Sequence, residues 1–118
     1  MAPALDRAKI RELLDLTGGE IDWLKDLMDT YLQDTRTRLD ELAGLVAAGS
    51  ADRIQRSAHG IKGSSSNIGA TQMADLCAGM EHHARVGDRA GTVAQLAELE
   101  AEFARIRADL PAALSPSR

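Results

Sequence analysis

The chain has 118 residues, with 14 Lys and Arg against 18 Asp and Glu, and a formal net charge of −4. That length predicts one domain over residues 1–118. We expect its motif-bearing core over about 20–110 and a flexible tail over 111–118. A single cysteine excludes an internal disulfide, and the sequence shows neither a membrane-length apolar run nor a signal peptide. Charges of both signs argue against binding to nucleic acid or to a membrane, so we expect a soluble cytoplasmic protein.

Composition and proline placement predict an all-α fold. The sequence contains 20 Ala and 15 Leu against six Ile and three Val, so helix formers far outnumber β-branched apolar residues. The prolines are Pro3, Pro111 and Pro116, which leaves the interior free of the strongest helix breaker. We expect an antiparallel up-down four-helix bundle with an additional short helix at the N-terminus.

Apolar periodicity places the first two helices at about residues 5–16 and 20–48. Gly49 fits the end of the second helix, because glycine tolerates the left-handed conformation found at helix C-termini. The second helix is amphipathic along most of its length. Thr35 and Arg38, however, occupy central positions where the period requires apolar side chains.

Three further helices follow the same periodicity, over about residues 51–67, 71–86 and 89–110. Ser50 and Asp88 are candidate N-caps for the first and the last of these. We expect Pro111 to stop the last helix. The predicted inner stripes are Ile54, Ala58, Ile61, Ser65 and Ile68, then Met73, Leu76, Cys77, Met80 and Ala84, then Val93, Leu96, Leu99, Phe103, Ile106 and Leu110.

The helix predicted over 51–67 contains residues that an ordinary bundle helix avoids. Gly60 and Gly63 lie in its interior, where each costs about 1 kcal/mol relative to alanine. Three serines follow at 64–66, and local backbone bonding or tight packing explains them better than phosphate binding does. A sequence that tolerates these costs indicates a surface that serves more than helix stability.

His59 is the candidate reactive residue of this surface. It lies next to the buried stripe but outside it, and Lys62 and Gly63 follow it on the same face. A neutral imidazole nitrogen is a good nucleophile near neutral pH, and a neighbouring ammonium can pair with phosphoryl oxygens. The missing side chain at Gly63 leaves room for another protein. Three further polar residues share the face: Gln55, Arg56 and Ser66.

The residues around this histidine resemble a family signature. Ala-His-Gly-Ile-Lys-Gly-Ser-Ser at 58–65 and Ile-Gly-Ala at 68–70 are similar to the motif of histidine-containing phosphotransfer (HPt) domains of multistep phosphorelays. The likeness extends over about 24–110 and includes Leu-Cys-Ala-Gly-Met-Glu at 76–81. Gly60 departs from the commoner residues of the family without removing a reactive group. The resemblance implies the same four-helix bundle that the composition predicts.

The resemblance also implies roles. His59 would accept a phosphoryl group from the aspartyl phosphate of a response-regulator receiver domain and pass it to another receiver. The phosphate would rest near Lys62, and Glu81 would orient the imidazole or the lysine. The receiver would dock over the residues that surround the histidine: Gly63, Gln55, Arg56 and Ser66.

The implied partners are receiver domains and a hybrid histidine kinase. Mg²⁺ would belong to the receiver, so this chain would bind no cofactor of its own. It would be a phosphocarrier and not an enzyme, because the sequence has no Gly-rich nucleotide loop and no room for an ATP-binding domain. We expect a monomer, since the predicted helices can bury their apolar faces within one chain.

Several alternatives remain at this point. The chain could be a helical adaptor that binds receivers without accepting phosphate, or a dimeric histidine phosphotransferase or kinase dimerisation module. Gly63 could serve close helix packing, and Glu81 could form an ordinary surface salt bridge. Trp23 fits either a half-exposed position or a contact between the first two helices.

A metal site is a weaker alternative. Glu81, His82 and His83 follow Cys77 by one helical turn. The two adjacent histidines would point about 100° apart on a helix, however, and a second ligand cluster is missing from the sequence. Cys77 is better explained as a core residue, which is the usual position of a free cysteine.

Overall fold

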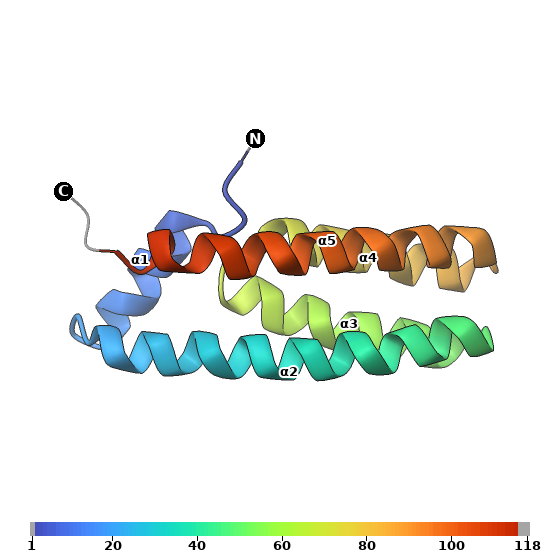
Figure 1. The fold of residues 1–118 in the computed structure, drawn as a ribbon, viewed down its shortest axis with the longest axis horizontal. Coiled ribbons are helices and arrows are strands. Elements are labelled where there is room, and N and C mark those ends of the chain that lie inside the picture. The colour runs from blue at the N-terminus through green and yellow to red at the C-terminus, as the bar shows by residue number, and fades with distance from the viewer. Residues whose placement is uncertain (1, 116–118) are drawn as a thin grey trace.

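The computed structural model describes residues 2–115 and contains helices without any strand over that range (Figure 1). The all-α class and the short additional N-terminal helix are therefore confirmed. The helices are α1 (Arg7–Leu16), α2 (Ile21–Ala48), α3 (Ala51–Asn67), α4 (Thr71–Arg85) and α5 (Arg89–Ala113).

The four longer helices run up and down in an antiparallel bundle (Figure 1). Helix α2 packs against α3 and α5, and α4 packs against the same two helices, so α2 and α4 are diagonal neighbours, as are α3 and α5. The short α1 lies at the end of the bundle where α2 begins and α5 ends. Each long helix thus buries one apolar stripe toward a shared centre.

Most of the predicted inner stripes are buried. In α3, Ile54, Ala58, Ile61 and Ser65 all face the core. In α5 the stripe is shifted at its start, because Val93 is 57% exposed and Thr92 is buried in its place. The hydroxyl of Thr92 donates to the carbonyl of Arg89 at 2.7 Å, which satisfies the polar group that this position buries. The prediction of Val93 as an inner residue was wrong.

The end of α5 also differs from the prediction. Pro111 lies inside the helix, which continues to Ala113. A proline removes one backbone hydrogen bond, but Leu114 N–H still donates to the Leu110 carbonyl at 3.0 Å. Burial of Ala113 in the core offsets the loss. The tail predicted from residue 111 therefore begins later, and its residues 116–118 lie outside the described range.

Helix termini follow the sequence signals in part. Asp88 caps α5 by accepting from the Gly91 N–H at 2.9 Å, as predicted. Ser50 occupies the N-cap position of α3 but makes no capping side-chain bond. Gly49 ends α2 with φ 68°, in the left-handed region. Helix α1 begins at Arg7, two residues later than predicted, with Asp6 as its cap.

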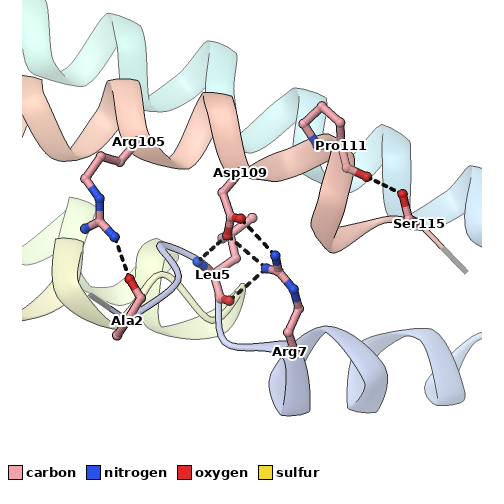
Figure 2. A network of polar contacts seen from close by, with 7 residues as sticks. All are labelled: Ala2, Leu5, Arg7, Arg105, Asp109, Pro111 and Ser115. Atoms are coloured by element: carbon pink, nitrogen blue, oxygen red, sulfur yellow. Dashed lines mark hydrogen bonds and ion pairs between the residues drawn. The ribbon is translucent and has the colours of Figure 1, made fainter. Parts of the chain in front are cut away.

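The residues around the start of α1 contact the last turns of α5 (Figure 2). Leu5 is fully buried, and its N–H donates to Asp109 on α5 at 3.0 Å. The guanidinium of Arg7 donates to both oxygens of the same carboxylate, each at 2.8 Å. This N-terminal clasp holds α1 on the end of the bundle. Within residues 2–115, every helix is too short or too polar to span a lipid bilayer.

Candidate functional site

Helix α3 is anchored along its inner face. Ala58 and Ile61 are fully buried. Ser65 is also fully buried, and its hydroxyl shares a 2.7 Å hydrogen bond with the hydroxyl of Tyr31 on α2. Burial raises the pKa of Tyr31, so this phenol stays neutral and available as a hydrogen-bond partner. The anchored inner face fixes the orientation of the outer face of α3.

His59 projects from that outer face, and its side chain is 71% exposed. The ring nitrogen Nδ1 faces Oε2 of Glu81 on α4 at 3.5 Å. The other nitrogen, Nε2, lies at the tip of the ring. The structure thus places one nitrogen toward a carboxylate and leaves the ring open to an incoming group.

Lys62 completes a cluster of three residues. Its ammonium lies 2.8 Å from Oε1 of Glu81, and the two side chains are 33% and 17% exposed. The contact is a close ion pair, and the buried Oε1 accepts no further hydrogen bond within the described residues. Glu81 therefore touches both the histidine and the lysine, instead of forming an unrelated surface salt bridge.

The two glycines of α3 have different surroundings. A Cβ at Gly63 would meet nothing within 4 Å, so close packing of another helix of residues 2–115 does not explain this glycine. A Cβ at Gly60 would collide with Nη1 of Arg38, which reaches across from α2. Both the mid-helix glycine and the arginine stand out in the sequence, but their contact depends on how α2 packs against α3.

The remaining predicted docking residues lie on the same side of α3 as the histidine. With about 100° per residue, Gln55, Arg56 and Ser66 all project within about 60° of His59. Arg56 and Ser66 are exposed, whereas the Gln55 amide folds back toward the Ala51 carbonyl at 3.5 Å.

The serine run has structural roles, as predicted for most of it. Ser64 donates to the Ile61 carbonyl at 3.1 Å, and Ser65 forms the buried bond to Tyr31. These bonds engage both hydroxyls with groups other than His59. A serine in a helix interior commonly satisfies itself on the preceding turn in this way.

The residues considered for a metal site do not converge. Cys77 is buried, and that burial raises the pKa of its thiol to about 12. Glu81 is engaged with α3, and His83 contacts Asp88 at 3.0 Å in the α4–α5 turn. His82 is exposed.

Trp23 on α2 is 47% exposed, which corresponds to the half-exposed position among its two alternatives.

The arrangement is suited to nucleophilic attack on an electrophile that a partner brings. The imidazole is accessible, a carboxylate faces its inner nitrogen, and a cation lies beside that carboxylate. The adjoining surface at Gly63 is open to a bulky partner. Within residues 2–115 no group of three or more His, Cys, Asp or Glu could hold a metal ion.

Comparison with known proteins agrees with this geometry. A family model described as Hpt domain matches residues 26–109. Histidine-containing phosphotransfer protein B (HptB) from Pseudomonas aeruginosa PAO1 is 32% identical, with a TM-score of 0.87 over 100% of both chains. ZmHP2, a histidine-containing phosphotransfer protein from maize, shares the fold at 23% identity and a TM-score of 0.83, over 94% of this chain and 83% of that one. No curated protein sequence matches the chain.

Proposed function

The chain belongs to the family of histidine-containing phosphotransfer (HPt) domains, and we propose that it is a phosphorelay intermediate in which His59 carries the phosphoryl group. The donor is an aspartyl phosphate on a response-regulator receiver domain, and the acceptor is an aspartate of another receiver. The observation that carries the proposal is the 71% exposed imidazole flanked by Lys62, Glu81 and the open position at Gly63.

The transfer step follows from the placement of the ring. Nε2 of His59 attacks phosphorus with its lone pair, and the bond from phosphorus to the aspartyl oxygen breaks, so the carboxylate leaves with that electron pair. The ring gains positive charge while Nδ1 keeps its proton. The Glu81 carboxylate, 3.5 Å from Nδ1, stabilises that charge. Transfer onward to the next receiver reverses these bonds.

Lys62 neutralises the transferred group. In the unphosphorylated chain its ammonium is held by Glu81 at 2.8 Å. A phosphoryl dianion on His59, one helical turn away, competes for this ammonium. Charge neutralisation and positioning dominate the catalysis of phosphoryl transfer. We expect the Mg²⁺ for this step to be held by the receiver, so that this chain acts as a carrier and not as a kinase.

Transfer of label from a phosphorylated receiver tests the proposal. Radiolabelled receiver phosphate should appear on this chain as an acid-labile, base-stable adduct, and His59→Gln should abolish it. The matched control is His82→Gln, because His82 is exposed on α4 and has no role in the proposed step. Receiver binding without label on the wild-type chain would instead establish the adaptor function.

Substitution at Gly63 tests the docking surface. Gly63→Gln should slow transfer on the order of tenfold or more, because a bulky side chain would hold the receiver away from His59. Gly44→Gln is the control, since Gly44 also lies in a helix interior with nothing within 4 Å of a Cβ. Both variants should gain helix stability. Equal transfer rates for the two would remove Gly63 from the docking surface.

We also propose that the domain is a monomer. The apolar stripes of α2, α3, α4 and α5 meet in one core within a single chain, so folding requires no second copy. Sedimentation at micromolar concentration should give the mass of one chain. A mass of two chains would favour the alternative of a dimeric histidine phosphotransferase.

A further inference from the structure

Arg38 lies on the surface beside the proposed phosphoacceptor. It is an exposed residue of α2, and its guanidinium reaches across to α3, where Nη1 occupies the space that a Cβ of Gly60 would need. Glycine is unfavourable in a helix interior. The close approach of Arg38 explains the glycine at position 60, because any larger residue there would displace the guanidinium.

Helix geometry places this guanidinium on the opposite side of His59 from Lys62. With about 100° per residue, Gly60 is turned one way from His59, and Lys62 is turned about 60° the other way, toward Glu81 on α4. Gly63 projects between His59 and Gly60 and is open to solvent. A strip of α3 without side chains therefore separates the histidine from Arg38.

The two flanking cations differ in how they are neutralised. Lys62 is paired with Glu81 at 2.8 Å. Arg38 forms no ion pair within the described residues, although its neighbour Arg36 on α2 pairs with both Glu100 and Asp40. Arg56, one helical turn before Gly60, is a second exposed guanidinium on the Arg38 side. On the α2 side of the histidine, Arg38 is thus an exposed guanidinium without an ion pair within 4 Å in the described residues, although Asp34 and Glu41 lie one turn away on α2.

We propose that Arg38 is a docking residue that binds a carboxylate at the rim of the receiver's acidic phosphorylation pocket. The inference rests on the proposed function, since that function brings an aspartyl phosphate to His59. A planar guanidinium can bind a carboxylate through two parallel hydrogen bonds and so fixes orientation as well as proximity. Arg38 acts on receiver binding and not on the bond exchange, because its position at Gly60 faces away from the Lys62 side of the histidine.

The test measures the rate of phosphoryl transfer against receiver concentration. Arg38→Ala should raise the half-saturating receiver concentration about three- to tenfold and weaken the dependence on salt, because an exposed charge mainly affects association. The rate at saturation and the lifetime of phosphohistidine should stay within about twofold of wild type. Lys62→Ala should instead leave the half-saturating receiver concentration near wild type, while the rate at saturation and the lifetime of phosphohistidine change. Arg107→Ala is the charge control, since Arg107 is exposed on α5, diagonal to α3.

Gly60→Ala keeps the charge of Arg38 but removes its place on α3. This variant should raise the half-saturating concentration in the same direction, and its effect should not add to that of Arg38→Ala, because both changes remove the same contact. An unchanged half-saturating concentration in Arg38→Ala would overturn the role of Arg38, and so would an effect confined to the saturating rate. Failure of the wild-type chain to take up label at all would instead overturn the proposed function.

Discussion

Two half-buried carboxylates in this small bundle have nearly equal exposure and different surroundings. The side chain of Asp109 in the N-terminal clasp is 19% exposed, and that of Glu81 beside His59 is 17% exposed. Asp109 accepts two bonds from Arg7 and one from a backbone N–H (Figure 2). Glu81 forms one close ion pair through its buried Oε1 and one contact at 3.5 Å through Oε2. At nearly equal burial, the two carboxylates thus differ in the number of hydrogen bonds that they accept.

In the N-terminal clasp, both oxygens of Asp109 accept hydrogen bonds. The hydrogen bond from Arg7 lowers the pKa of Asp109 below its usual value of 3.8, and the backbone bond from Leu5 adds to this. A lowered pKa in the folded state means that the ionised carboxylate stabilises the fold. That contribution is present above about pH 4 and is lost as the pH falls through the lower folded-state pKa. Glu81, by contrast, accepts no backbone hydrogen bond and makes polar contacts only with Lys62 and His59 among the described residues.

The largest expected effect on stability is therefore at the clasp. Asp109→Asn should lower the free energy of unfolding by about 1–3 kcal/mol, because the substitution removes charge-assisted bonds to Arg7. Urea denaturation followed by circular dichroism measures the loss. The difference from wild type should shrink as the pH falls below about 4, where the native carboxylate becomes protonated.

Transfer activity provides the contrast for the same variant. At a temperature where Asp109→Asn remains folded, phosphoryl uptake by His59 should match wild type, because the clasp joins α1 to the end of α5 and does not include the acceptor residues. A loss of transfer without a loss of stability would show that the two regions are coupled through the bundle.

The sequence predicted those features that depend on local spacing. The four long helices, the inner stripe of α3 and the outward position of His59 all follow from a period of 3.6 residues. Gly63 was recognised because a mid-helix glycine has a local cost. Pro111 and Val93 were misjudged at the two ends of α5, where burial of Ala113 and of Thr92 overrides the local signals.

Contacts between distant segments were not predictable in the same way. The Arg7–Asp109 pair joins residues 102 positions apart, and nothing in either local sequence specifies the partner. To predict the contact between Arg38 and Gly60, one would likewise need to know which faces of α2 and α3 meet. Glu102 is 4% exposed within α5, although a carboxylate is usually found at the surface. Helical periodicity identifies a face, whereas pairing of charges depends on the register between helices.

The smallest expected change in stability, with a larger change in activity, is at Glu81. Glu81→Gln should alter the free energy of unfolding by no more than about 0.5 kcal/mol, because Lys62 is 33% exposed and can turn toward water when its partner is neutralised. Phosphoryl uptake should slow about three- to tenfold, since the amide no longer stabilises the positive charge that attack creates on the His59 ring.

Glu98→Gln is the matched control for that substitution, because it neutralises an exposed carboxylate on α5 and should change neither quantity. Stopped-flow transfer at saturating receiver and urea denaturation measure the two effects on the same samples. A drop in stability as large as that of Asp109→Asn, with transfer unchanged, would make Glu81 a structural acid and remove the distinction between the two carboxylates. Slower transfer at constant stability would instead support the role of the Glu81 carboxylate in stabilising the charge on the His59 ring.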